Sequence, residues 1–509
     1  MTLVEDALES ALLLPTAPQL WQRVVQLGLA LDAEARKGLA DRIAASPCSM
    51  ADAEWLRCSA LANLTRDPVW MVRQARLAQP ATTPDAIMTL LTLAWHDALV
   101  RTVDRKDFIQ ALQQVDIVRL QGLAASWIAG GAAPQVRNEG AITRVAIYTP
   151  HVSSSRQGGT SFMLNIMSMF AKLGVELHAF SGQETQVPAE ASYRGADERI
   201  KPMPVERETL KLGVPGKFQL TIPNTDFSVR ARFSQVLAAI DKFQPDLVVI
   251  VGFMTPLAYK LYAQYPCVGL SIHAVPPAVP VDAWLCPAQE DSAACWPSLP
   301  LAEPHPFPWR FWPTGRVEPV SRTKLGIAAE ATVLVTAGYR LQSEVTPSWG
   351  GNMLALLEAH PSLHWLLIGV AGGKLVEALP VHPRIHLLEP QERLESWLAA
   401  CDIYANPPRV GGGASVAMAM EQGLAVAAYA DTDGGDKVRE LAADSDEAYF
   451  GMLARWANDR DARRRTGETL RERYRSNLDM SSPEASASLL QACRNAVASF
   501  NLRIQHDHA

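Results

Sequence analysis

The segment 401–428 constrains the fold most, because two short apolar stretches enclose a glycine-rich loop and a helical pattern. The residues predict a strand over 402–405, a helix over 414–422 and a second strand after it. Gly423 is placed to end the helix, since the residue after a helix often adopts a left-handed conformation. A strand, a helix and a further strand in this order form the repeating unit of a parallel α/β sheet.

The loop between this strand and this helix favours a phosphate or diphosphate site. Consecutive glycines let the backbone approach a ligand closely, and a helix N-terminus offers unpaired N–H groups and the positive end of its dipole. A flexible turn is the alternative interpretation of a glycine run. The position of the loop at the carboxyl end of a strand, where ligands bind in open parallel sheets, favours the site. The residues assigned to it are Gly411, Gly412, Gly413 and Ser415, whose hydroxyl adds a donor in the first helical turn.

Length and composition bound the class of protein. The chain has 509 residues, which suggests roughly three domains of ordinary size. A net charge of -6 and the absence of a dense Lys/Arg run argue against a nucleic-acid partner. Seven scattered cysteines without CxxC spacing indicate neither a zinc site nor a disulfide framework, and their odd number fits a reducing compartment. We expect no membrane span and a cytoplasmic location, since no secretory signal or long apolar stretch is visible.

The apolar periodicity changes along the chain and predicts three domains. Residues 1–135 show helical spacing and almost no strand signal, which predicts an all-α domain of roughly five to seven helices that packs against or holds a partner. Residues 142–315 alternate strands and helices and predict a first Rossmann-like domain. After a crossing rich in proline and tryptophan, residues 320–509 predict a second one, whose terminal helices can cross back onto the first lobe.

Two consecutive Rossmann-like domains, with a phosphate site in the second, resemble the GT-B glycosyltransferases. Segments 334–369 and 401–426 resemble the start and the donor loop of the GT-B nucleotide-binding lobe. Segment 245–287 resembles the first-lobe segment of the bacterial adhesin N-glycosyltransferases and the related O-GlcNAc transferases. The resemblance implies an α/β fold of the GT-B type, with two lobes facing across a cleft behind an all-α domain. It also implies that a nucleotide-diphosphate sugar is the donor.

The resemblance assigns further residues. Arg340 matches the basic residue that follows the first strand of the nucleotide-binding lobe and meets the donor diphosphate, and Gly338 stands at the same strand end. A guanidinium group suits phosphate oxygens because it can bind them bidentately; a surface salt bridge is the alternative. His273 and Asp282 match a histidine and an aspartate of the first-lobe segment.

Two positions depart from the family pattern. Val410 and Met418 stand where the commonest retaining GT-B enzymes carry two glutamates, and Met418 also stands where O-GlcNAc transferases hold an aspartate against the donor ribose. The missing glutamates favour inversion of the sugar over retention. The ribose contact and the identity of the nucleotide stay open.

An inverting transfer needs a base near the acceptor and positive charge near the leaving diphosphate. His273, at the end of a first-lobe strand, is the first candidate because imidazole titrates near neutrality. A histidine that is merely hydrogen-bonded in a loop is the alternative. His151, after the first strand of the lobe, is the second candidate. Gly159, in the loop after the same strand, is expected to face the diphosphate across the cleft.

The segment 431–437 contains an Asp-x-Asp motif, which invites a metal interpretation. We expect no metal, because the motif follows the donor strand of a second lobe, where two-lobed enzymes usually work without one. Asp436 or Lys437 is expected to close the donor pocket or to meet the sugar. An acidic turn is the alternative.

The leading hypothesis is an inverting, metal-independent glycosyltransferase that moves a sugar from a UDP-sugar to a protein acceptor held partly by the α domain. No cofactor is expected, since the nucleotide-sugar is a substrate. Transfer to a polysaccharide or a glycan precursor is one alternative. A catalytically silent GT-B protein that binds a partner is another, and a UDP-sugar epimerase would need paired carboxylates in the cleft.

Overall fold

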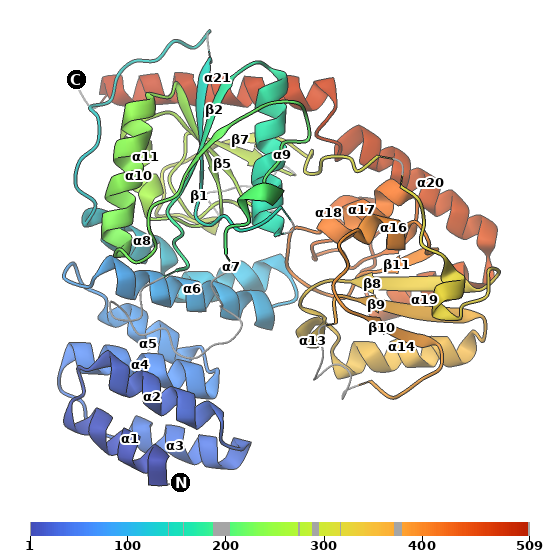
Figure 1. The fold of residues 1–509 in the computed structure, drawn as a ribbon, viewed down its shortest axis with the longest axis horizontal. Coiled ribbons are helices and arrows are strands. Elements are labelled where there is room, and N and C mark those ends of the chain that lie inside the picture. Colours follow the sequence, from blue (N-terminus) through green and yellow to red (C-terminus); the bar gives the residue numbers. More distant parts are fainter. Residues whose placement is uncertain are drawn as a thin grey trace.

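The computed structural model describes residues 2–506 except 141, 156, 187–203, 273–274, 288–294, 316 and 371–378. Within them, an N-terminal group of helices precedes two parallel α/β lobes that lie side by side (Figure 1). None of the described helices combines the length and the apolar character that a bilayer crossing requires.

The N-terminal region has eight helices among the described residues: α1 (Thr2–Leu13), α2 (Pro18–Leu29), α3 (Ala33–Ala45), α4 (Ala51–Thr65), α5 (Val69–Leu77), α6 (Pro84–Arg101), α7 (Arg105–Gln114) and α8 (Ile117–Ser126). The periodicity predicts one helix over 107–128, but the structure has two. Asp116 interrupts them with a left-handed φ of 56°. The sequence contains neither glycine nor proline there to mark the break.

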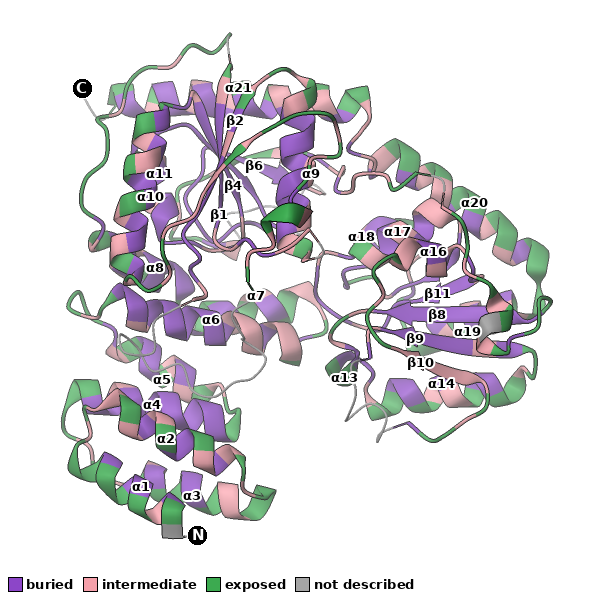
Figure 2. Ribbon diagram, viewed as in Figure 1, coloured by how far each residue is buried: buried purple, intermediate pink, exposed green. Residues whose placement is uncertain are grey.

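The helices pack in two groups. The first four surround a small apolar cluster of their own, which includes Trp21, Ile43 and Leu61. In contrast, α6–α8 share one continuous apolar cluster with the first lobe, in which Phe108 of α7 lies with Phe253. The second group of helices is therefore packed onto the first lobe as part of its core (Figure 2).

The first lobe is built on a seven-stranded parallel sheet in the order β3-β2-β1-β4-β5-β6-β7. Helices α9 (Gly158–Lys172), α10 (Val229–Phe243) and α11 (Leu257–Gln264) belong to it. The central strands are buried apolar runs, as expected for a sheet covered on both faces. The strands are β1 (Arg144–Thr149), β2 (Glu176–Ser181), β3 (Gln219–Thr221), β4 (Leu247–Val251), β5 (Cys267–Leu270), β6 (Ala283–Cys286) and β7 (Glu303–Pro306).

The second lobe has a five-stranded parallel sheet in the order β10-β9-β8-β11-β12. Its strands are β8 (Thr332–Ala337), β9 (Leu363–Ile368), β10 (Ile385–Leu388), β11 (Ile403–Ala405) and β12 (Ala425–Ala427). Its helices are α13 (Leu341–Glu344), α14 (Pro347–Ala359), α16 (Leu394–Leu398), α17 (Ala414–Gln422), α18 (Gly435–Val438), α19 (Asp446–Asn458) and α20 (Arg460–Asn477). The described residues also form three 3₁₀ turns, η2 (Arg207–Thr209) in the first lobe and η3 (Arg322–Leu325) and η4 (Arg439–Leu441) in the second.

The last helix, α21 (Pro483–His506), returns to the first lobe and packs on β5 and β6 (Figure 1). Its buried side chains Leu489 and Val497 join the apolar cluster of that lobe, so the predicted crossing of the terminal helices is confirmed. The two connections between the lobes run side by side. The backbone N–H of Phe311 donates to Leu478, and that of Met480 donates back to Phe311.

Candidate functional site

The carboxyl edge of the second sheet holds the predicted donor residues. The chain passes from β8 outwards to β9 and β10, then returns to the other side of β8 to form β11 and β12. The point where the strand order reverses therefore lies between β8 and β11. Gly338 and Arg340 follow β8, and the glycine loop 411–413 follows β11. Ligands of open α/β sheets bind at such a point.

The N-terminus of α17 opens at this point without a side-chain cap. Gly413 is the N-cap residue with φ 63°, and Ala414 behind it is exposed. The first-turn N–H groups and the positive end of the helix dipole therefore lie within reach of a ligand. Gly423 ends the helix with φ 79°, as predicted.

Close packing explains the three glycines. A Cβ atom on Gly411 would lie 2.9 Å from Asp433 Oδ2, and one on Gly413 would lie 2.4 Å from the Asp433 carbonyl oxygen and 2.6 Å from Lys437 Nζ. A Cβ atom on Gly412 would lie 3.1 Å from the carbonyl oxygen of Ile272, which follows β5 in the first lobe. The loop is thus pressed between the turn 431–437 and the opposite lobe, where the two carboxyl edges meet.

Arg340 holds this junction together. Its Nη2 donates to the carbonyl oxygen of Val410 at 2.7 Å and lies 2.9 Å from Glu344 Oε1, while Nη1 donates to the carbonyl oxygen of Leu99 at 3.2 Å. Leu99 belongs to α6, so one guanidinium joins the helical region to the glycine loop. A second link runs from the backbone N–H of Arg105 to the Asp431 carbonyl oxygen.

A buried charged network beneath the loop was not predicted. Arg409 Nη1 donates to Glu344 Oε2 at 2.9 Å, its Nη2 donates to Ser415 Oγ at 3.1 Å, and its Nε lies 3.3 Å from Asp433 Oδ2. Burial alone would lower the pKa of Arg409, but the two carboxylates raise it well above its ordinary value. The signal in the sequence was an arginine two residues before the glycine run. Its partners, 65 residues upstream and 24 downstream, appear only in the fold.

The carboxylates of the Asp-x-Asp turn are engaged by the protein itself. Asp433 Oδ1 accepts from Asn406 Nδ2 at 2.9 Å, and Asp436 Oδ1 lies 2.8 Å from Lys437 Nζ. The same ammonium donates to the Asp433 carbonyl oxygen at 2.8 Å. In the part of the chain that the structure describes, no three His, Cys, Asp or Glu side chains gather as a metal site would require.

The first sheet has its own reversal point between β1 and β4. His151 follows β1, and its Nδ1 lies 3.3 Å from Thr185 Oγ1. Gly159 lies in the first turn of α9, where Gln157 caps the helix by accepting from the N–H of Thr160 at 2.7 Å. His273, the first-choice base, falls outside the described residues.

Glu184 is a buried carboxyl at this edge that the sequence did not reveal. The hydroxyls of Tyr148 and Thr255 both donate to its Oε1, and Oε2 has no hydrogen-bond partner among the described residues. Burial raises the pKa of Glu184 from its usual 4.5 to about 7. The residue follows β2 within a polar, proline-rich stretch that gave only weak strand signals, so nothing placed it beside β1.

Asp282, which the resemblance matches to an aspartate of the first-lobe segment, lies where β5 and β6 begin. Its Oδ2 accepts from the N–H of Cys267, the first residue of β5, at 2.8 Å, and Asp282 itself immediately precedes β6. The side chain is therefore at the amino edge of the sheet, away from the cleft. Burial raises its pKa to about 6, although Arg503 Nη2, 3.0 Å from Oδ1, favours the ionised form.

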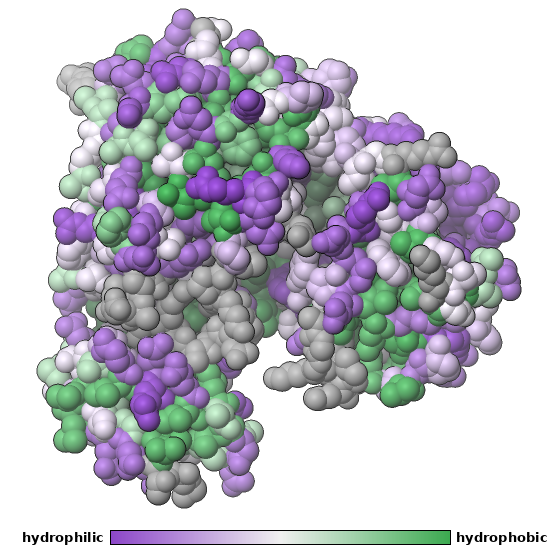
Figure 3. Space-filling view, viewed as in Figure 1, coloured by the Kyte–Doolittle hydropathy of each residue, from purple (hydrophilic) through white to green (hydrophobic). Residues whose placement is uncertain are grey.

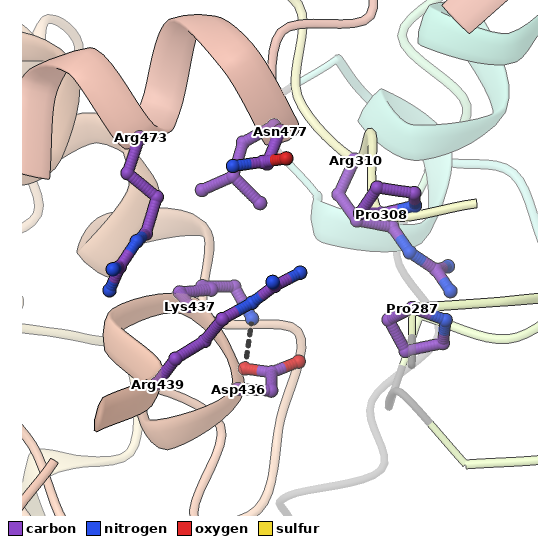
Figure 4. Close-up of a pocket in the computed structure, with 9 residues that line it drawn as sticks. Pro287, Pro308, Arg310, Asp436, Lys437, Arg439, Arg473 and Asn477 are labelled. Carbon is purple, nitrogen blue, oxygen red and sulfur yellow. Dashed lines mark hydrogen bonds and ion pairs between the residues drawn. The ribbon is translucent and has the colours of Figure 1, made fainter. Parts of the chain in front are cut away.

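A small pocket opens between the lobes next to the turn 431–437 (Figure 4). The surface is indented where the two lobes meet (Figure 3). Pro287 and Pro308 line the pocket from the first lobe, just after β6 and β7. The residues that complete its wall are Arg310, Asp436, Lys437, Arg439, Arg473, Asn477 and Leu478. The predicted residues Asp436 and Lys437 thus face the gap between the lobes.

No protein-family model and no curated protein matches the sequence. Among solved structures, the chain is similar to a mutant O-GlcNAc transferase of Thermobaculum terrenum, with a TM-score of 0.60, 14% identity and coverage of 97% of this chain and 94% of that one. It is also similar to the S. aureus protein MnaA in complex with UDP, with a TM-score of 0.41, 13% identity and coverage of 64% and 91%.

The similarity to the transferase spans both lobes and the helical region. Together with two parallel sheets that meet at their carboxyl edges, it shows that the chain has the GT-B fold behind an N-terminal helical region.

Proposed function

We propose that this chain is a glycosyltransferase that binds a UDP-sugar and transfers the sugar to a protein acceptor. One observation carries the proposal: the uncapped N-terminus of α17 opens at the reversal point of the second sheet, behind the loop 411–413. This arrangement is suited to a diphosphate, because backbone N–H groups and a helix dipole stabilise its charge without moving.

The neighbouring residues have distinct roles in this proposal. Arg340 fixes the Val410 carbonyl and hence the loop, and the buried Arg409 positions Ser415 at the start of α17. Lys437, whose Nζ lies against the loop, adds positive charge for the leaving group. In an inverting step, an acceptor nucleophile attacks the anomeric carbon, the bond to the diphosphate oxygen breaks, and the diphosphate carries the charge away. His151, on the first lobe, is the proposed base that receives the acceptor proton.

Metal independence is part of the proposal. It is supported by the ion pairs of Asp433 with Arg409 and of Asp436 with Lys437, because carboxylates paired with protein cations are not free to bind a metal ion. The charge of the diphosphate would then be met by cations of the protein. Transfer activity that is unchanged by a chelator such as EDTA would agree with it. Activity that the chelator abolishes and Mg²⁺ restores would contradict it.

A protein acceptor is supported by the position of the helical region. Arg340 and Asp431 of the donor side are hydrogen-bonded to residues of α6 and α7, so a polypeptide held by these helices lies next to the cleft. Incubation of a labelled donor with protein acceptors and, separately, with glycan acceptors tests this proposal. Label transferred to protein would support it, and label transferred only to glycan would favour the polysaccharide or glycan-precursor alternative.

One observation favours the catalytically silent alternative. Val410 is buried in the apolar cluster that joins α6–α8 to the first lobe, and Met418 is apolar as well, so neither position offers an acid to a ribose. A silent protein would bind no nucleotide, or would bind one without ever hydrolysing or transferring its sugar.

Calorimetric titration with UDP, GDP and dTDP tests the donor site, with Gly413→Ala as the perturbation. The added methyl would meet the Asp433 carbonyl oxygen and Lys437, and we expect UDP binding to weaken at least tenfold, about 1.4 kcal/mol. Gly174→Ala is the matched control. Gly174 has φ 72° and nothing within 4 Å of an added Cβ, so it imposes a similar left-handed backbone cost without a clash. If no nucleotide binds at millimolar concentration, the proposal fails and the silent protein is favoured.

A further inference from the structure

The pocket between the lobes is strongly cationic. Arg310, Lys437, Arg439 and Arg473 line it together with a single carboxylate, Asp436. Four positive charges and one negative charge leave a formal excess of three positive charges. The lining comes from both lobes, since Arg310 follows β7 and the other three arise from α18, η4 and α20.

Arg310 is a buried cation that makes no direct ion pair among the described residues. Its exposed fraction is 7%, Nη1 donates to the Ser271 carbonyl oxygen at 3.0 Å, and Nη2 donates to that of Leu285 at 3.2 Å. Nε has no hydrogen-bond partner within the described chain. Burial lowers the pKa of Arg310 to about 10, although the charge of Asp436 favours the ionised form. Because a buried guanidinium is costly to keep charged, an anion in the pocket would stabilise it.

Arg439 is the second cation of the pocket that makes no direct ion pair among the described residues. Its side chain is exposed and extends into the pocket (Figure 4), and its charge acts on the neighbouring Glu440, which is already paired with Arg473. Its backbone has φ 52° and ψ -118°, a conformation that favours glycine. An arginine at a position that glycine would occupy more easily indicates that its charge is needed there.

The other two cations are already engaged. Lys437 Nζ pairs with Asp436 and with the Asp433 carbonyl oxygen. Arg473 donates to the Val438 carbonyl oxygen and pairs with Glu440. The positive charges of the pocket that are not committed to a direct ion pair therefore belong to Arg310 on one lobe and Arg439 on the other.

We propose that this pocket is a binding site for a phosphate-type polyanion, held between Arg310 and Arg439. Guanidinium groups bind phosphate oxygens bidentately, and two of them on opposite walls match a multiply charged anion. Because each lobe supplies one of them, the bound anion bridges the lobes. The phosphate chemistry has two possible sources, the diphosphate of the donor or a separate phosphate-bearing effector.

Titration of the full chain with inorganic pyrophosphate at low ionic strength tests the site. We expect Arg439→Gly to weaken pyrophosphate binding at least tenfold while thermal stability is unchanged or higher, because glycine suits the backbone at this position. Arg465→Gln removes an exposed charge on α20 away from the pocket and should leave binding unchanged. Arg310→Gln, if it folds, should weaken binding as Arg439→Gly does. Pyrophosphate binding that is equal in the wild type and Arg439→Gly, or absent in the wild type, would overturn the proposal.

Competition with UDP distinguishes the two sources. If saturating UDP displaces pyrophosphate, the pocket is the diphosphate part of the donor site; if pyrophosphate still binds, the site serves a separate effector. Both results support an anion site. The site also stands if pyrophosphate binds but no nucleotide does, in which case the proposed donor site alone fails.

Discussion

Replacement of Glu184 by glutamine should change how the stability of the first lobe depends on pH. The carboxyl is buried at the reversal point of the sheet, with Tyr148 and Thr255 donating to one oxygen. Its pKa rises from the usual 4.5 to about 7 on folding, since burial disfavours the charged form. Between these two values the unfolded chain has lost the proton and the folded chain has kept it. Wild-type stability therefore falls as the pH rises through this range.

The magnitude follows from the two pKa values. They differ by about 2.5, and each unit corresponds to about 1.36 kcal/mol, so the penalty above pH 7 amounts to about 3 kcal/mol. In Glu184→Gln the amide keeps the acceptor oxygen for Tyr148 and Thr255 but cannot ionise. Relative to the wild type, the variant should gain roughly 3 kcal/mol between pH 4.5 and pH 8.

Hydrogen exchange of the β1 and β4 amides measures the stability of the first lobe separately from that of the second. The exchange rates are followed at several pH values and corrected for the intrinsic rates. Asp282 also has a raised pKa, but it titrates in both proteins and cancels in their difference. Glu330→Gln, at an exposed position, should show no such trend. A stability difference between Glu184→Gln and the wild type that stays constant from pH 4.5 to pH 8 would refute the reasoning.

Three further perturbations test other parts of the structure. Arg503→Ala leaves the buried Asp282 without its ion pair and should lower the free energy of unfolding by roughly 3–5 kcal/mol, measured with denaturant. Arg494→Ala, at an exposed position of the same helix, should lower it little, and equal effects of the two changes would contradict the pairing. Arg409→Lys should weaken nucleotide binding at least tenfold in calorimetry, because an ammonium cannot span the two carboxylates that the guanidinium joins; unchanged affinity would show that the network does not position the loop. Removal of residues 483–509 should speed hydrogen exchange in β5 and β6 far more than in β8 and β9, and uniform loss of protection would argue against the packing of α21 on the first lobe alone.

The sequence predicts the elements whose signals are local. Apolar periodicity and flanking residues predict a helix over 229–243 and a strand over 332–337, and the structure has both elements with these bounds. The edge strand β7 was missed because it contains two prolines, which an edge strand tolerates but a sequence pattern treats as a loop. The short strands β3 and β6 lie in polar or proline-rich stretches and have no periodic signal of their own.

In the candidate site, too, only the features with a local sequence signal were predictable. The glycine loop and the N-terminus of α17 were predictable, since the strand, the glycines and the helix are adjacent in sequence. The orientation of Arg340 was not, because its partner Leu99 lies 241 residues away in another part of the fold. The environments of the buried side chains Arg409, Glu184 and Arg310 likewise depend on contacts between distant segments. Burial and pairing, which decide their chemistry, exist only once the lobes have assembled.

The return of α21 to the first lobe gives the chain the topology of an inserted domain. The first lobe begins at β1 and is completed by the last helix, so the second lobe is an insertion between β7 and α21. Because the backbone of Phe311 is hydrogen-bonded to Leu478 and Met480, the chain enters and leaves this insertion at neighbouring points. The whole donor-side module can thus be exchanged for that of another protein by two adjacent cuts, with the first sheet and its covering helix left intact.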